Sequence, residues 1–284
     1  MVRMKAFTLI ELLVVISIIA LLIGILLPAL GAARRTANEM KNSTQIRGII
    51  QGCILYAQGN NDYYPGVNSN GDLVAATDSP SGTTQYWWNN DGKYPATRYA
   101  ILLNGNYFVP QYMINPQDTK TQAALGTDVT GSATNTGNFS YAMLELNETA
   151  GTTDSTGHES LSNDIRNNDW KDTTNSQAVV LSDRNTGTGA DNTTAKSMWT
   201  TNPGDWRGSV GWNDNHVTFE SQPLVTTRYT GGVTIDAING TGTFGTNHGD
   251  NLFTAGDTES GVTFTGTNYD AALVCNTATD LTGQ

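Results

Sequence analysis

Histidines are the first residues to consider for chemistry, because an imidazole can bind a metal or transfer a proton near neutral pH. The chain has three of them, His158, His216 and His248. They form no His-Glu-x-x-His zinc motif, and the chain has no Gly-x-Ser-x-Gly nucleophile motif. Asp214 stands two residues before His216, but an Asp-Asn turn between strands explains that spacing more simply than acid–base catalysis. The sequence therefore predicts no enzyme.

Calcium is a second candidate chemistry, since Asp and Asn oxygens at short spacing in loops are typical calcium ligands. Two clusters have this composition: Asp250, Asn251, Asp257 and Glu259 in one predicted loop, and Asn68, Asn70 and Asp72 in another. Neither cluster matches a strict calcium signature, so ordinary polar turns remain the alternative. Apart from this candidate calcium site, the sequence predicts no cofactor.

A third candidate is Glu11, a single carboxylate at the start of an apolar run. Residues Leu12–Leu30 contain no charge, and at about 1.5 Å per residue their helix would reach roughly 28 Å, enough to span a membrane. Arg3 and Lys5 precede the run, which favours export of the rest of the chain. A carboxylate costs on the order of 2.5–3.5 kcal/mol near the centre of a membrane helix and less near its end, so Glu11 calls for a partner.

The residues Phe7-Thr8-Leu9-Ile10-Glu11-Leu12-Leu13-Val14-Val15 follow a short basic leader. This segment resembles the N-terminal signal of type IV pilins and of the pseudopilins of type II secretion. The resemblance implies that a prepilin peptidase cuts between Ala6 and Phe7 and methylates the new terminus of Phe7. It also implies that Glu11 neutralises the amino terminus of a neighbouring subunit. The family has Gly before the cut, where this chain has Ala6.

Gly24 and Pro28 interrupt the apolar run with two residues that weaken a helix. Pilins of the resembling family often have a Pro 21 residues after the first mature residue, and Pro28 stands there. We expect a kink or local melting at these positions, although both residue types are also common in membrane helices. The resulting divisions are a leader over 1–6, a membrane or filament-core helix over 7–30, and an amphipathic continuation over 31–58.

The continuation carries an apolar stripe, and Gly59 with the polar residues after it predicts a helix end near residue 58. The remaining residues, 59–284, are rich in Thr, Asn, Gly, Asp and Ser, which favour turns and short strands. Tyr99–Phe108 is either a short helix or a strand. Runs typical of strands are Phe139–Leu146, Ala178–Leu181, Val210–Trp212, Val217–Glu220, Leu224–Tyr229, Val233–Ile235 and Val262–Phe264. The expected fold class is α+β, a long N-terminal helix packed on an antiparallel sheet with long loops, as in type IV pilins.

Charge and cysteine content describe the outer region further. Six basic and two acidic residues lie at or before residue 48, so the rest carries a formal charge of about −15. Such a region repels phosphate backbones and excludes nucleic acid as its partner. Cys53 and Cys275 form a disulfide if the region is exported, or else remain two buried thiols, and their spacing does not decide between these.

Aromatic residues and two local motifs complete the outer region. Trp87, Trp88, Trp199, Trp206 and Trp212 fill the core or form exposed sugar-binding or subunit contacts, and we expect at least half of them in the core. Residues 56–65, 178–184 and 208–217 resemble the large pilin-like proteins of planctomycetes. In that group Gly stands where this chain has Asn215, and a His stands where it has Gly204, so any role of that His is absent here.

The sequence thus predicts a structural subunit of a type IV pilus-like or type II secretion pseudopilus filament. The partners implied are further copies of the chain, prepilin peptidase, and a pilus or secretion assembly platform in the inner membrane. The chain would lie in the inner membrane before assembly and in a periplasmic or extracellular filament afterwards. The alternative is a membrane-anchored extracellular module that binds sugars or surfaces and does not polymerise. Glu11 distinguishes the two, because an anchor that never assembles has no neighbouring amino terminus to pair with.

Overall fold

The structure is a computed structural model of the 284-residue chain. It describes residues 9–74, 92, 95–120, 138–144, 146, 148–153, 159–161, 169–187, 195–200, 202, 204–225, 227, 250–253 and 273–274. The chain divides into two compact units, Met1–Lys41 and Asn42–Gln284. We call these the N-terminal unit and the outer unit.

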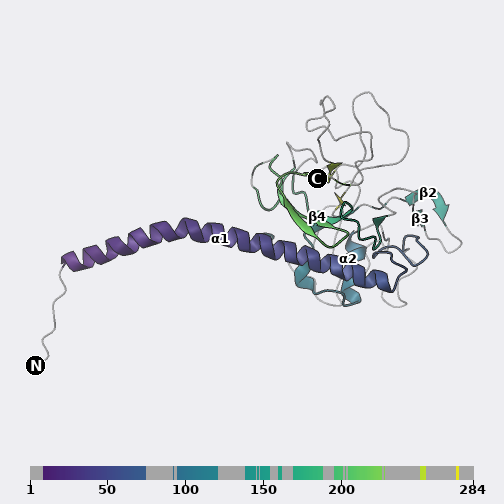
Figure 1. Cartoon of the computed structure of the whole chain (residues 1–284), viewed down its shortest axis with the longest axis horizontal. Helices are drawn as coiled ribbons and strands as arrows, with labels where there is room; N and C mark the ends of the chain where they lie inside the picture. The colour runs from purple at the N-terminus through teal and green to yellow at the C-terminus, as the bar shows by residue number, and fades with distance from the viewer. Residues whose placement is uncertain are drawn as a thin grey trace, which may run out of the picture. The chain divides into compact units, whose positions relative to one another are not determined.

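Helix α1 spans Leu9–Gln58 and is the only long helix among the described residues (Figure 1). It runs through Gly24 and Pro28 without a break and curves in its N-terminal half (Figure 1). The helix ends where sequence analysis placed its end. Asn60 and Asp62 donate their backbone N–H groups to the Ala57 carbonyl, at 2.9 and 3.0 Å.

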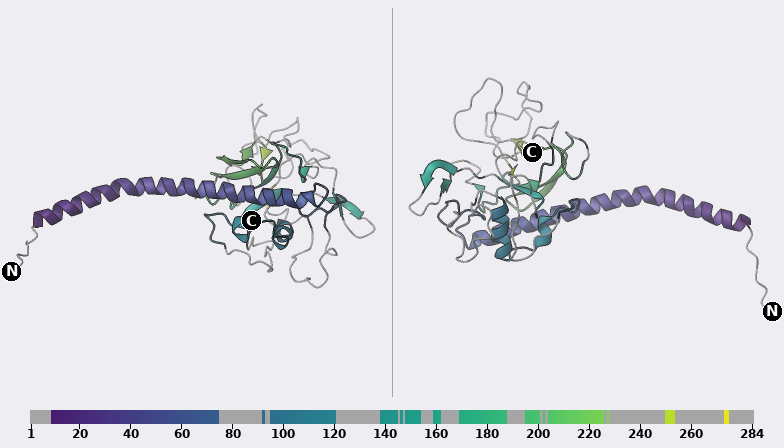
Figure 2. Two further views of the ribbon diagram at one scale, coloured as in Figure 1. Left: turned by 60° about the horizontal axis from the view of Figure 1, so that its bottom comes forward. Right: turned by 180° about the vertical axis from the view of Figure 1, so that it is seen from behind.

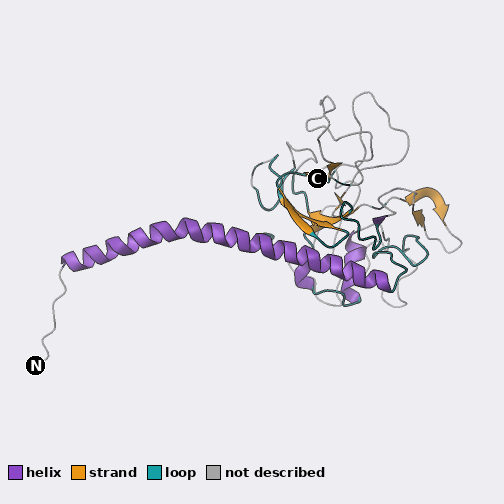
Figure 3. Ribbon diagram, in the orientation of Figure 1, coloured by secondary structure: helices purple, strands orange, loops and turns teal. Residues whose placement is uncertain are grey.

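The outer unit contains a five-stranded sheet with the order β6-β5-β4-β1-β9 (Figure 3). Every neighbouring pair in it is antiparallel. Its strands are β1 Tyr141–Leu144, β4 Val179–Asp183, β5 Gly208–Trp212, β6 Val217–Glu220 and β9 Leu273–Val274. Two smaller sheets are formed by β2 Glu148–Thr153 with β3 Glu159–Leu161, and by β7 Leu224–Val225 with β8 Asp250–Asn251.

The C-terminal part of α1 packs on this sheet through its apolar stripe, and the views in Figure 2 show the two lying together. The stripe is completely buried and consists of Ile46, Ile49, Ile50 and Cys53. A Cβ atom at Gly211 of β5 would meet Ile50 Cδ1 at 2.6 Å. Glycine at this position therefore allows the helix to approach the sheet closely.

Two short elements cover another part of the core. Helix α2 spans Pro95–Asn104, and the 3₁₀ helix η2 spans Pro110–Met113. The Tyr99 hydroxyl of α2 donates to the Tyr141 carbonyl of β1 at 3.1 Å, and the Tyr99 ring lies 4.9 Å from that of Phe139. These contacts attach α2 to β1, an inner strand of the main sheet.

The α+β architecture predicted from the sequence is confirmed. β1, β4, β5 and β6 each overlap a predicted strand, and the Tyr99–Phe108 alternative resolves mainly to helix. The strand predicted over Leu224–Tyr229 was too long, since β7 covers only Leu224–Val225 and residue 227 lies outside any strand. The strands predicted at Val233–Ile235 and Val262–Phe264 lie outside the described residues.

Candidate functional site

The N-terminal unit presents an unusually apolar surface. Every large hydrophobic side chain from Leu12 to Leu30 is 46–67% exposed within the single chain. The helix has an 18-residue window of mean hydropathy 3.1, and no part of that window is buried. By length and composition this helix can cross a membrane, and its exposed apolar side chains require either lipid or protein neighbours.

Glu11 lies in the first described turn of α1, where the partial positive charge of the helix amino terminus favours a carboxylate. Its side chain is exposed on the helix surface. The predicted cleavage residues Ala6 and Phe7 lie outside the described residues. A Cβ atom at Gly24 would meet nothing within 4 Å, so the single chain gives this glycine no packing role.

A buried polar cluster in the outer unit was not predicted from the sequence. Its centre is the Asp183 carboxylate at the end of β4, which is completely buried. Four groups donate hydrogen bonds to it: Asn42 Nδ2 at 2.7 Å, Trp199 Nε1 at 2.9 Å and the Ser209 backbone N–H at 2.8 Å, all to Oδ2, and Asn115 Nδ2 at 2.5 Å to Oδ1. We call this set the Asp183 cluster.

Asn42 links the Asp183 cluster to α1 with all its side-chain hydrogen-bonding groups. Its Nδ2 group also donates to Ser209 Oγ at 2.9 Å, and its Oδ1 accepts from the Tyr141 hydroxyl at 2.8 Å. Burial raises the pKa of Tyr141 well above its usual value, so the hydroxyl keeps its proton and remains a donor. The cluster therefore ties the helix to β1, β4 and β5 together.

Glycine makes room for the cluster. A Cβ atom at Gly208 would lie 2.7 Å from Asp183 Cβ and from Trp206 Cζ2. Asp183 itself belonged to a segment singled out from the sequence, but no role was assigned to it. The available signal was a carboxylate two residues after the apolar run Ala178–Leu181 of a predicted strand.

The turn between β5 and β6 contains Asp214 and His216, whose spacing was assigned to a turn rather than to acid–base catalysis. Asp214 Oδ1 accepts the His216 backbone N–H at 3.1 Å and also contacts His216 Nδ1. Partial burial raises the pKa of Asp214, but the hydrogen bonds from His216 outweigh this and leave the pKa below its usual value. Asn215 adopts φ 66°, a left-handed conformation that Asn and Gly tolerate. Asp214 and His216 thus stabilise the turn.

Asn213 anchors the same turn to the core. Its Oδ1 accepts from the backbone N–H groups of Thr173 and Thr174, each at 3.1 Å, and its Nδ2 donates to the carbonyls of Asp169 and Lys171. The His216 ring stacks on Trp212, with centroids 5.4 Å apart and planes 4° apart. Every polar atom of the Asn213 side chain is used in fixing the loop.

The structure describes only part of the predicted calcium cluster. Asp250 and Asn251 lie in strand β8 rather than in a loop, while Asp257 and Glu259 are outside the described residues. Within the described part of the chain, no group of three acidic, His or Cys residues is placed to hold a metal. In the other cluster, Asn68 Oδ1 accepts from the backbone N–H groups of Asn70 and Asp72, which closes a turn.

Of the predicted disulfide, only Cys53 is described. It is completely buried in the core, and burial raises the pKa of its thiol to about 12. Cys275 is outside the described residues.

Trp206 and Trp212 are buried, as expected for core aromatics, whereas Trp199 is partly exposed and Trp87 and Trp88 are not described.

Comparisons with known proteins find an N-terminal motif and a pilin relative. The prokaryotic N-terminal methylation motif matches residues 1–27. The chain is also 44% identical, over 59 residues, to the type IV wide pilus major component of Thermus thermophilus. The chain thus carries an N-terminal methylation motif and is similar, over part of its length, to a type IV pilin.

The match to the Thermus pilin covers 21% of this pilin-like chain and 45% of that relative. The chain thus spans less than half the length of the curated relative that it matches. No solved structure matches the chain.

Proposed function

We propose that the chain is a filament subunit of a type IV pilus or of a type II secretion pseudopilus. The observation that carries this proposal is the exposed, uncharged segment Leu12–Leu30 directly after Glu11, which begins within the methylation motif matched over residues 1–27. Surface of this kind is stable in a bilayer and equally stable inside a bundle of identical helices.

In this proposal, prepilin peptidase cuts between Ala6 and Phe7 in the inner membrane and methylates Phe7. The mature subunit then leaves the bilayer through an assembly platform and enters a periplasmic or extracellular filament. Within the filament core the dielectric is low, and an unpaired carboxylate is costly. The methylated terminus of a neighbouring subunit offsets the charge of Glu11.

The first test is the intact mass of the protein isolated from its own cells. We expect a subunit that begins with N-methylated Phe7 and lacks residues 1–6. A subunit that begins at Met1, or after Gly31 as a cleaved secretory protein would, contradicts the processing step.

The second test is Glu11→Ala. We expect the yield of sheared filaments to fall at least tenfold, because the neighbour's positive terminus is left without a partner, whereas cleavage and membrane insertion persist. Glu11→Gln, the matched control for shape, should fail less completely. Normal filament yield from Glu11→Ala would instead support the anchored binding module that does not polymerise.

A further inference from the structure

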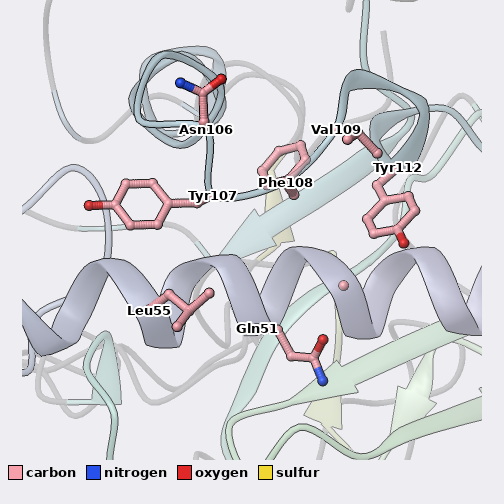
Figure 4. A pocket seen from close by; sticks show the side chains of 8 residues that line it. Gln51, Leu55, Asn106, Tyr107, Phe108, Val109 and Tyr112 are labelled. Atoms are coloured by element: carbon pink, nitrogen blue, oxygen red, sulfur yellow. The ribbon is translucent and has the colours of Figure 1, made fainter.

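Exposed hydrophobic side chains concentrate at one place on the outer unit. Among its described residues, three large hydrophobic side chains are more than a third exposed: Leu55, Val109 and Phe219. Leu55 and Val109 line the same groove, which has a volume of about 390 Å³ (Figure 4). Exposed apolar surface of this kind marks an interaction site more often than isolated exposed residues do.

The groove lies between α1 and the segment that joins α2 to η2. A Cβ atom at Gly48 would lie 2.3 Å from Tyr112 Cε2, and one at Gly52 would lie 3.1 Å from Phe108 Cδ1. These two glycines, one helical turn apart, let the aromatic rings rest directly on the helix. The Tyr107 ring packs edge-on against Tyr56, with centroids 5.7 Å apart. The groove is therefore built by packed side chains and exists before anything binds to it.

The charge of the groove indicates its occupant. None of the residues that line it carries a formal charge, whereas the chain beyond residue 48 carries about −15. Two copies of such a chain repel each other across most of their surface. A neutral apolar patch is where two copies can make contact with the least electrostatic repulsion. The uncharged, exposed segment Leu12–Leu30 is the complementary surface on another copy.

We infer that this groove receives the apolar segment Leu12–Leu30 of a second copy of the chain during assembly. The inference rests on the proposed filament function and specifies its subunit contact. Leu30 precedes Gly48 by 18 residues and Leu12 precedes Leu55 by 43 residues. If neighbouring helices run parallel, the two copies are shifted along the helix axis by roughly 27–65 Å.

Charge substitution tests the contact. Leu55→Glu and Val109→Glu each place a carboxylate in the groove while removing a side chain that is about half exposed, so the fold should persist. We expect the yield of sheared filaments to fall at least tenfold, because the carboxylate loses water against an apolar partner. Gln177→Glu, on an exposed turn, adds the same charge elsewhere and should give normal yield.

Cross-linking tests the contact without depending on yield. Leu55→Cys is combined with one further cysteine at each position from Leu12 to Leu30 in turn, in a Cys275→Ser background. Within one chain these positions are at least about 37 Å apart along the helix, so a disulfide between them joins two copies. In oxidised filaments, the cysteine pairs should form disulfides that give a ladder of covalent oligomers. The second cysteines that do so should lie every three or four residues within one stretch of Leu12–Leu30, and Leu55→Cys alone should give no ladder.

The outcomes separate this inference from the proposed function. Filaments that form with Leu55→Glu and Val109→Glu at wild-type yield, or that give no ladder from any pair, overturn the groove contact and leave the Glu11 pairing standing. A processed wild-type chain that never forms filaments overturns both. If a Glu variant has lost its fold by circular dichroism, the cross-linking result decides.

Discussion

Asn42 of α1 donates a hydrogen bond of 2.7 Å to Asp183, which lies 141 residues later at the end of β4. Asn42 is also the first residue of the outer unit. A buried carboxylate is costly unless donors surround it, and a helix that slid or rotated against the sheet would separate Asn42 from Asp183. The pair therefore fixes both the depth and the rotation of α1 on the sheet.

Asp183→Asn should lower the free energy of unfolding by about 1–3 kcal/mol at neutral pH. Asp183 accepts at both oxygens, and an amide in its place points its NH₂ group at the Asn115 Nδ2 donor. Turning the Asn115 amide would place its NH₂ group against the Gln117 backbone N–H, which now donates to Asn115 Oδ1 at 2.8 Å. Urea unfolding of the chain lacking residues 1–30 measures the effect.

The control is the exchange Asp183→Asn with Asn115→Asp. This double variant restores one donor and one acceptor between the two positions, so it should recover at least half of the lost stability. A double variant as unstable as the sum of the two single variants would show that the charge must be at residue 183 itself.

The stability contribution of Asp183 should depend on pH. Burial raises the pKa of Asp183 from 3.8 to about 6, even though its four donors act in the opposite direction. The folded chain thus binds this proton more tightly than the unfolded chain. The contribution of Asp183 to the free energy of unfolding therefore grows as the pH falls from 6 to 4 and is lost as the pH rises through that window.

Comparison of wild type with Asp183→Asn isolates this effect from other acidic groups. The destabilisation caused by the substitution should be larger at pH 4 than at pH 7. A destabilisation that instead grows with pH would mean that the hydrogen bonds, not burial, determine the pKa of Asp183.

Gly48→Ala should destabilise the outer unit by about 1–3 kcal/mol, because the new methyl group cannot coexist with the Tyr112 ring in its present place. Gly31→Ala is the matched control on the same helix. A Cβ atom there meets nothing within 4 Å, so the control should be neutral or should stabilise the helix by up to about 1 kcal/mol. Equal melting temperatures for both variants would show that Tyr112 moves aside freely.

Removal of residues 1–30 should leave a soluble, monomeric, acidic domain. The fragment keeps the groove at Leu55 and Val109 but lacks the apolar segment that we expect to fill it. Size-exclusion chromatography with light scattering measures its mass in solution. A stable oligomer would place an assembly interface elsewhere on the outer unit.

The sequence predicted the elements whose signal is local. Three local signals predicted α1: the apolar run, the stripe from Ile46 to Cys53, and the polar turn after Gln58. Short runs typical of strands, bounded by turn residues, located four strands of the main sheet. The hairpin of β2 and β3 was not predicted, because Glu148–Thr153 is mostly polar and shows no alternation of apolar and polar residues.

The Asp183 cluster could not be predicted for a different reason. Its members come from α1, from the loops at Asn115 and Trp199, and from two strands, and only the folded chain brings them together. The groove could not be predicted either. In a sequence, Gly48 and Gly52 indicate only a less stable helix, and the structure is needed to show that the Tyr112 and Phe108 rings pack against them. Long-range packing, rather than local propensity, determines both features.

The position of Asn42 also has a mechanical meaning. In a filament that is pulled along its axis, tension entering the subunit through the apolar half of α1 reaches the globular body at that residue first. There it meets the hydrogen bonds that join Asn42 to Asp183, Ser209 and Tyr141, before it reaches the apolar contacts of Ile46 and Ile49. Under such tension the Asp183 cluster would be the first contact to bear the load. The force needed to break its hydrogen bonds, rather than the force needed to separate the apolar stripe, would then determine when the outer unit detaches from α1.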